Sequence, residues 1–256
     1  AAMEQCEGVI AFHHVNFRYP GATEDVLSDI DFVAEPGKTT AIIGSTGCGK
    51  STLVNLLPRF YDVTGGEITL DGTDIRKYTL QDLREHIGFV PQKGVLFSGT
   101  IASNLRFGAE DASDEQIREA AEIAQATEFI DSKQDGYESA IAQGGSNVSG
   151  GQKQRAAAAR ALITEPRLLL ADEPTGALDS KSTDEMLGIF SRINQKGQTI
   201  VMVTHSVKAA SRAGRVLFIK DGEVFHQVYR GELSDEQFYQ KISATLTMLA
   251  TGGERR

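Results

Sequence analysis

The sequence contains no tryptophan and only two cysteines, Cys6 and Cys48, among its 256 residues. Two cysteines are too few for a disulfide framework, and one lies in a glycine-rich loop, so a reducing compartment, the cytoplasm, is expected. The chain also lacks any run of roughly 20 consecutive apolar residues, the length that a membrane-spanning helix needs, and its first residues show no signal-peptide pattern. We therefore expect no direct membrane insertion.

Positive charge is also scarce. The chain has 26 Lys and Arg against 35 Asp and Glu, which gives a formal net charge of -9. Nucleic-acid binding needs a concentrated basic surface to neutralise phosphates, so nucleic acid is not an expected partner. The hydrophobic content of 40% is sufficient for the core of one large or two-lobed domain.

The first third of the chain shows the alternation of strands. Apolar and polar residues alternate over residues 9–33 around a turn at 19–22, which predicts antiparallel strands. Residues 38–43 form a buried-strand pattern that ends in a glycine-rich loop. A second hairpin is predicted over residues 68–75, with the turn at Asp71-Gly72.

The middle of the chain has helical periodicity. Thr79 with Asp82, and Ser113 with Gln116, match the capping box that opens many helices. The second match precedes apolar residues on one helical face, namely Ile117, Ala120, Ala121 and Ala124. The region is therefore predicted to be mainly helical.

Short apolar runs return in the last third, at residues 168–171, 200–203 and 216–219. A helical stripe lies between the first two, formed by Met186, Leu187, Phe190 and Ile193. Strands that alternate with helices predict a parallel α/β sheet. A third capping box, Ser234 with Gln237, opens a final amphipathic helix, and packing on its own domain is favoured over binding a partner.

The glycine-rich loop after residues 38–43 matches G-x-x-x-x-G-K-[ST], the P-loop. It consists of Gly44, Ser45, Thr46, Gly47, Cys48, Gly49, Lys50 and Ser51, and Thr52 follows. Backbone N–H groups of such a loop surround a β-phosphate, Lys50 reaches the β- and γ-phosphates, and Ser51 ligates magnesium. The motif predicts ATP and Mg2+ as cofactors. An ordinary strand-to-helix turn explains neither Lys50 nor Ser51.

Two acids end the apolar run at 168–171. Asp172 suits a magnesium site, and Glu173 suits the polarisation of an attacking water. Two acids after an apolar strand are more often a capping or turn feature. The P-loop upstream favours the catalytic interpretation, because parallel strands end at the same edge of a sheet. The thiol of Cys48, beside the phosphate site, is expected to be chemically sensitive.

A third motif points to a family. Val148-Ser149-Gly150-Gly151-Gln152 resembles the signature of ABC (ATP-binding cassette) proteins, normally Leu-Ser-Gly-Gly-Gln, with Val148 as a mild departure. The other hallmarks of this family follow in order: Gln92 of the Q-loop, Asp179 of the D-loop, the switch His205, and Tyr19 as the aromatic residue that stacks on adenine. The resemblance covers about residues 8–230.

The resemblance implies an α/β fold, a P-loop NTPase with a RecA-like core, an antiparallel β-lobe and an inserted α-helical subdomain. The whole chain, 1–256, would be a single ABC nucleotide-binding domain. Within it, 1–78 and 156–230 would form the core and β-lobe, 79–155 the helical subdomain, and 231–256 a C-terminal helix and tail.

The resemblance also implies a mechanism. A nucleotide-dependent homodimer would hold ATP between the P-loop of one chain and residues 149–152 of the other, with Asp179 near the nucleotide. The implied catalytic residues are Glu173, His205, Gln92 and Lys50, and the implied Mg2+ ligands are Ser51, Gln92 and Asp172. The implied partner is a separate transmembrane domain of an exporter, which would place the chain at the inner face of the cell membrane.

The two halves of the chain resemble different subfamilies. Residues 1 to about 155, through 92–105 and 136–147, resemble cassettes fused to membrane domains in multidrug and peptide exporters. The remainder, through 171–180 and 229–234, resembles separate-chain ATPases of bacitracin-resistance exporters. We hypothesise a chimera, natural or engineered, joined between Ser149 and Ile163. The run of four alanines at 156–159 favours this, and drift towards a good helix former is the alternative.

Three functions remain open from the sequence. The first is a Mg2+-dependent ATPase of transporter type. The second is an ATP-gated dimerisation or binding module with little turnover. The third, a soluble ABC protein of translation or DNA repair, is disfavoured by the single cassette, the acidic charge and the exporter-like segments.

Overall fold

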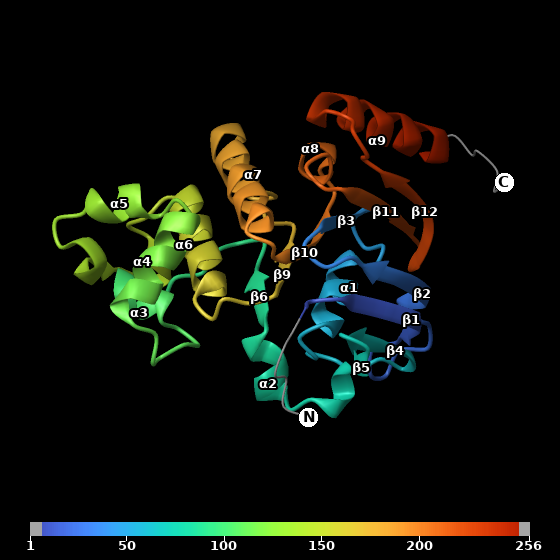
Figure 1. The fold of residues 1–256 in the computed structure, drawn as a ribbon, viewed down its shortest axis with the longest axis horizontal. Helices are drawn as coiled ribbons and strands as arrows, with labels where there is room; N and C mark the ends of the chain where they lie inside the picture. Colours follow the sequence, from blue (N-terminus) through green and yellow to red (C-terminus); the bar gives the residue numbers. More distant parts are fainter. Residues whose placement is uncertain (1–6, 251–256) are drawn as a thin grey trace.

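The computed structural model describes residues 7–250. Figure 1 shows two groups of elements: helices α3 to α6 gather at one end, and two sheets with helix α9 lie at the other. Helix α7 (Ser180–Gln195) lies between them. The predicted α/β class is therefore confirmed, and the strands and helices are distributed as two lobes.

The central sheet has six strands in the order β12-β11-β3-β10-β9-β6. All neighbours are parallel except β12, which is antiparallel to β11. The strands are β3 (Thr39–Ile43), β6 (Ile87–Val90), β9 (Leu168–Asp172), β10 (Thr199–Thr204), β11 (Arg215–Lys220) and β12 (Glu223–Tyr229). Every residue of β10 is buried, as expected for a strand covered on both faces.

Strand β6 corrects the expected position of the helical subdomain. It lies within residues 79–155, yet it is the edge strand of the central sheet, paired in parallel with β9. Helix α2 (Leu80–Glu85) directly precedes it. Residues 79–90 therefore belong with the core, because their backbone completes its sheet, and the helical subdomain begins after Val90. At its other end, helix α6 (Gly150–Leu162) crosses the expected boundary at residue 155.

The first sheet is antiparallel, in the order β2-β1-β4-β5. Its strands are β1 (Ile10–Phe17), β2 (Leu27–Ala34), β4 (Gly65–Leu70) and β5 (Thr73–Asp74). Phe12 and Phe32 face each other in register, and their rings stack at 4.7 Å. Both predicted hairpins are confirmed, although Ile75 begins the 3-10 turn η1 (Ile75–Lys77) instead of extending the second one. Helix α1 (Lys50–Leu56) packs its buried face on this side of the core.

The helical lobe contains α3 (Ile101–Leu105), α4 (Asp114–Ile123), α5 (Thr127–Asp131) and α6. Two short strands, β7 (Gly99–Thr100) and β8 (Ala140–Ile141), pair beside them, and the 3-10 turns η2 (Gly136–Glu138) and η3 (Gln143–Gly145) flank β8. The capping box of Ser113 and Gln116 is present at the start of α4. Thr79 caps α2 by accepting from the N–H of Asp82, but its hydroxyl donates to the Asp82 carboxylate, so only half of that predicted box forms.

The C-terminal helix packs on its own domain, as predicted. Ser234 and Gln237 exchange reciprocal bonds at the start of α9 (Asp235–Ala250). Phe238 and Ile242 are fully buried beside α8 (Val207–Ala210) and β11. Within residues 7–250, no helix is both long and apolar enough to cross a membrane.

Candidate nucleotide site

The P-loop occupies the turn between β3 and α1, where the sequence predicts it. Its first glycine has no room for a side chain, since a Cβ atom on Gly44 would lie 2.4 Å from the carbonyl oxygen of Ile219 and 2.6 Å from the Cys48 sulfur. The loop is thereby held against β11. Cys48 itself is 7% exposed, and burial raises the pKa of its thiol. A protonated thiol is a poor nucleophile, so this burial works against the expected chemical sensitivity.

Lys50, the first residue of α1, points back into the loop. Its side chain is 6% exposed, and Nζ donates hydrogen bonds of 2.8 Å to the carbonyl oxygens of both Gly44 and Ser45. The same Nζ lies 3.7 Å from Oε1 of Glu173. A fixed ammonium group thus lies within the glycine-rich loop, an arrangement that suits the binding of a phosphate chain.

Ser51 and Asp172 lie side by side, although 121 positions separate them. The Ser51 hydroxyl donates to Oδ1 of Asp172 at 2.9 Å. Burial raises the pKa of Asp172, and the Ser51 hydrogen bond partly opposes this shift. A hydroxyl and a carboxylate are oxygen donors of the kind that Mg2+ prefers, with water and phosphate oxygens completing its shell. The residues therefore fit the predicted metal.

Glu173 is held by His205. Its Oε2 accepts from the backbone N–H of His205 at 3.0 Å and lies 2.8 Å from the ring Nδ1. A carboxylate only accepts, so Nδ1 carries the ring proton and Nε2 is the acceptor nitrogen when the ring is neutral. The Glu173 backbone has φ of 47°, and its N–H donates to Val203 of the neighbouring strand. Glutamate and histidine are thus oriented as one unit beside Lys50.

Tyr19 lies beside the same helix. Its hydroxyl is 2.9 Å from Oγ1 of Thr52 in α1, and its ring meets Phe17 and Tyr61 edge-on, with centroids 4.8 and 5.2 Å away. A cavity of about 710 Å3 adjoins it, lined by Tyr19, Tyr61 and the turn at residues 20–22. Aromatic rings therefore line a cavity near α1, and Tyr19 is the residue that the family resemblance implies as the adenine contact.

Gln92 follows strand β6 and is exposed. Its Nε2 lies 3.0 Å from the point where a Cβ atom on Gly176 would stand, and Gly176 itself donates to the carbonyl oxygen of Glu173. The structure thus brings Gln92 to the loop that carries the two acids. Among the described residues, the P-loop, Tyr19, Gln92, Asp172, Glu173 and His205 all occupy this one region.

The signature lies elsewhere. Ser149 is the N-cap of α6, where its hydroxyl accepts from the N–H of Gln152 and its own N–H donates to the Gln152 side chain. Asp179 caps α7 by accepting from Ser182, a hydrogen bond that lowers the Asp179 pKa. Gly151 is packed against Ser182, so the two helix starts adjoin. Within residues 7–250, no hydrogen bond or ion pair joins Ser149 or Asp179 to the P-loop.

Gln154, which lies near the site, was not predicted from the sequence as a functional residue. Gln154 of α6 is 1% exposed and makes two hydrogen bonds to the backbone around Gln92. The sequence pattern could have indicated it, because Gln154 shares its helical face with Ala158 and Ala161. A polar residue on such an apolar face is buried and needs hydrogen-bond partners.

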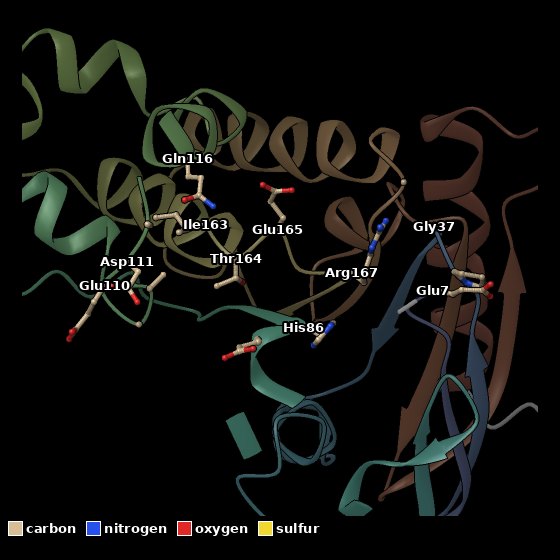
Figure 2. A pocket seen from close by; sticks show the side chains of 16 residues that line it. Glu7, Gly37, His86, Glu110, Asp111, Gln116, Ile163, Thr164, Glu165 and Arg167 are labelled. Carbon is tan, nitrogen blue, oxygen red and sulfur yellow. The ribbon is translucent and has the colours of Figure 1, made fainter. Parts of the chain in front are cut away.

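A larger cavity than the one beside Tyr19 is not part of this site. It measures about 1250 Å3 and opens between residues 108–112, His86 and residues 163–167. Figure 2 shows Glu165, Arg167 and His86 around this hollow. These residues precede β9 and β6, whereas Asp172 and Gln92 lie at or beyond the other ends of the same strands. The cavity therefore lies at the amino-terminal edge of the sheet, away from the P-loop.

Comparisons with known proteins agree with this geometry. The sequence profile described as ABC transporter matches residues 27–176. An uncharacterized ABC transporter ATP-binding protein of Bacillus subtilis, YfiB, is 40% identical over 93% of this chain and 41% of its own length. The ATP-dependent lipid A-core flippase of Pseudomonas aeruginosa is 39% identical over 90% of this chain and 38% of its own. The chain thus spans about two fifths of the length of these relatives.

A solved structure is similar over nearly the whole chain. A bacterial Atm1-family ABC exporter with ATP bound superposes with a TM-score of 0.82 and 31% identity, covering 96% of this chain and 44% of the exporter. These matches extend across residues 149–163 and give no support to a chimeric junction there. With the profile matching more than half of its length, this chain belongs to the ABC transporter family and is an ATP-binding cassette.

Proposed function

We propose that the chain hydrolyses ATP with Mg2+ at composite sites formed by two copies of itself. One observation carries this proposal: Lys50, Ser51, Asp172, Glu173 and His205 are joined by direct contacts at one edge of the sheet, whereas Ser149 lies outside that region. The first group is equipped to bind and cleave a phosphate chain. Its counterpart, the signature, is supplied by the second copy.

In this proposal the nucleotide binds along the P-loop. Backbone N–H groups of residues 44–52 surround the phosphates, with Lys50 as the fixed positive charge. The Tyr19 ring provides a flat apolar surface for adenine, since its hydroxyl is already engaged with Thr52. The Gly44 and Ser45 carbonyl oxygens hold the Lys50 ammonium in the loop.

Mg2+ would be held by Ser51 and Asp172, with Gln92 as a third ligand. When bound, the metal would neutralise charge on the phosphate chain held by these residues. Asp172 is suited to this because burial penalises its charge, and a bound divalent cation would relieve that penalty. Gln92 lies on the exposed loop after β6, and its Nε2 comes within 3.0 Å of the position a Cβ atom on Gly176 would take, in the loop that follows the two acids.

Glu173 is the proposed general base. Its Oε2 is engaged by His205, and Oε1 faces the ammonium of Lys50 at 3.7 Å. The carboxylate is therefore fixed in orientation, which general-base catalysis requires. His205 would present its second ring nitrogen to the γ-phosphate region, and its side chain is 58% exposed.

The second copy would contribute Ser149, Gly150, Gly151 and Gln152, together with Asp179. Ser149 and Asp179 are exposed, and both begin helices whose N–H groups point outward. A head-to-tail arrangement of two chains would place each such surface over the P-loop of the other.

An exposed apolar patch is the proposed contact with a transmembrane domain of an exporter. Val95, Phe97 and Phe107 are 52%, 45% and 58% exposed, and the two phenylalanine rings lie 4.7 Å apart. Arg160 lies over both rings and fixes their position. Such a patch marks an interaction surface, and a membrane domain would place the chain at the cytoplasmic face of its membrane.

The test is phosphate release from Mg2+-ATP at several protein concentrations. We expect specific activity to rise with concentration, because two chains form each site. Glu173→Gln should abolish release and retain ATP binding. ATP-dependent dimerisation of the wild type without phosphate release would instead favour the dimerisation module, and the absence of both would reject the composite site.

A further inference from the structure

The side-chain amide of Gln154 holds the loop that carries Gln92. Its Nε2 donates to the carbonyl oxygen of Pro91 at 2.6 Å, and its Oε1 accepts from the N–H of Gly94 at 2.7 Å. These two partners lie on either side of Gln92 and Lys93. One buried side chain, 1% exposed, therefore fixes both ends of the loop segment from a helix 60 residues away in sequence.

The loop also lies directly on α6. A Cβ atom on Gly94 would be 2.4 Å from the carbonyl oxygen of Lys153, so only glycine allows this approach. Further along, Arg160 donates to the carbonyl oxygen of Val95 at 3.1 Å and to that of Asn104 at 2.8 Å. The segment after β6 is thus attached to α6 by hydrogen bonds at residues 91, 94 and 95.

The same helix begins at the signature. Ser149 caps α6 and Gln154 lies five residues later, about 7.5 Å along a rigid helix. Gln92 belongs to the ATP site of its own chain, and Ser149 is proposed to contact the ATP of the second chain. A displacement of the Gln92 loop must therefore move α6, or break the two Gln154 hydrogen bonds.

We propose that Gln154 is a positioning residue that sets Gln92 for Mg2+ and couples it to the signature helix of the same chain. This inference rests on the proposed function. Glutamine suits the position because Pro91 offers only an acceptor and Gly94 only a donor at these two points. Glutamate keeps the acceptor but directs a second oxygen at the Pro91 carbonyl, and methionine makes neither bond.

The test compares Gln154→Glu with a matched control, Gln198→Glu. Gln198 also donates to a proline carbonyl, that of Pro166 at 2.9 Å, but remote from the site. For Gln154→Glu we expect the Mg2+ concentration that gives half-maximal phosphate release to rise about tenfold or more. ATP affinity measured in EDTA should stay within about twofold of wild type, because the P-loop is unchanged. Gln198→Glu should retain the Mg2+ dependence of the wild type.

A second readout does not need turnover. In the wild type, Mg2+ should increase the rise in melting temperature that ATP produces, and Gln154→Glu and Gln154→Met should both lose that increment while Gln198→Glu keeps it. An unchanged Mg2+ dependence in both Gln154 variants would overturn the proposal, as would a parallel loss of ATP affinity in EDTA, which indicates general damage. If the wild type releases no phosphate but shows the Mg2+ increment, only the proposed hydrolysis fails, and the increment still decides the role of Gln154. A wild type without either response would reject both.

Discussion

The P-loop region and the signature region differ in how their residues are tied to the rest of the chain. Lys50, Ser51, Asp172, Glu173 and His205 come from three separate segments and are joined by contacts between those segments. At the signature, Ser149 bonds only within its own helix among the described residues, to Gln152 and to the N–H of Lys153. The P-loop region is thus held together by contacts between separate segments of the chain. The signature region is an exposed start of a helix.

This difference explains what a single copy of the chain can do. The P-loop region holds its charges in place before any ligand arrives, which favours nucleotide binding by one chain. Under the proposed function, the signature surface acts only when a second copy of the chain brings its ATP site against it. If the two regions divide the work in this way, variants of each should differ in activity, in stability and in how they complement one another.

Mixing two inactive variants should restore activity. Lys50→Ala damages the P-loop half, and Ser149→Arg damages the signature half, so each homodimer lacks an intact site. A mixed dimer has one site with both halves intact, formed by Lys50 of one chain and Ser149 of the other. We expect an equimolar mixture to show about one quarter of wild-type phosphate release, because half of the dimers carry one working site.

The control for this experiment mixes Lys50→Ala with Glu173→Gln. Both changes fall in the P-loop region, so neither chain of a mixed dimer supplies an intact P-loop half. We expect no recovery. Recovery in this control, or its absence in the first mixture, would show that the two regions are not divided between chains.

Removing the charge of Asp172 should raise the stability of the fold and lower its activity. Its folded pKa is raised by burial, so its contribution to stability is present below the ordinary aspartate pKa and is lost as the pH rises through the raised value. At neutral pH the partly buried carboxylate therefore lowers stability. Asp172→Asn keeps an oxygen for Ser51, and we expect a higher melting temperature in EDTA together with a loss of Mg2+-dependent phosphate release on the order of 100-fold.

Asp179, at the start of α7 beside the signature, has a pKa shift opposite in direction to that of Asp172. Its pKa is lowered by hydrogen bonds from Ser182, so its contribution is present above the ordinary aspartate pKa and is lost as the pH falls through the lowered value. Asp179→Asn should not raise the melting temperature. If both variants melt above the wild type, charge burial at Asp172 is not the cause.

Larger residues in α6 should destabilise the signature helix. Ala156 and Ala158 are 2% and 0% exposed within the core that α6 shares with the helical lobe. Interiors are closely packed, so Ala156→Leu and Ala158→Leu should each lower the free energy of unfolding by about 1 to 3 kcal/mol. Thermal melts decide this, with exposed Ala177→Leu as the control. A rise in melting temperature would indicate a cavity left by small residues, and no change would remove the packing argument for a chimera.

The smallest effect is expected away from both regions, at His14. Its pKa is raised by the hydrogen bond to Asp29 at 2.6 Å and by the charge of Asp31. The contribution to stability is therefore present below the ordinary histidine pKa of about 6.5 and is lost as the pH rises through the raised value. The side chain is exposed, so His14→Gln should change the pH dependence of the melting temperature only slightly and leave phosphate release unchanged. A large change would mean that this surface is coupled to the site.

Much of the site could be predicted because its motifs are local. The P-loop is one continuous segment, and Asp172 and His205 follow apolar strands whose ends must meet at one sheet edge. Helix starts such as those at Ser113 and Ser234 could also be predicted from the sequence, since a capping box depends on two residues three positions apart. Strand β6 could not be predicted from the sequence, because it has only four residues and includes Gly88, which lowers its strand propensity.

The contacts between distant segments could not be predicted from the pattern. The hydrogen bonds of Gln154 join residues 60 and 63 positions apart, and nothing in the spacing selects Pro91 and Gly94 as its partners. Similarly, Glu173 has a left-handed backbone and bonds through its N–H to Val203 in another strand, and neither feature is visible in the local pattern. These features belong to tertiary packing, which overrides local preference.

The cap at Ser149 has a consequence for recognition. A serine hydroxyl has one proton, and here its oxygen accepts from the Gln152 N–H, so the proton is the part that can be directed outward. Aspartate and asparagine cap helices as well as serine does, but under the proposed function an aspartate at position 149 would bring a second negative charge against the phosphates of ATP. Helix stability alone would thus permit several residues at this position, whereas threonine is the substitution that preserves both the cap and a hydroxyl donor. The residue at position 149 is therefore limited by the need for a hydroxyl hydrogen-bond donor as much as by the need for a helix cap.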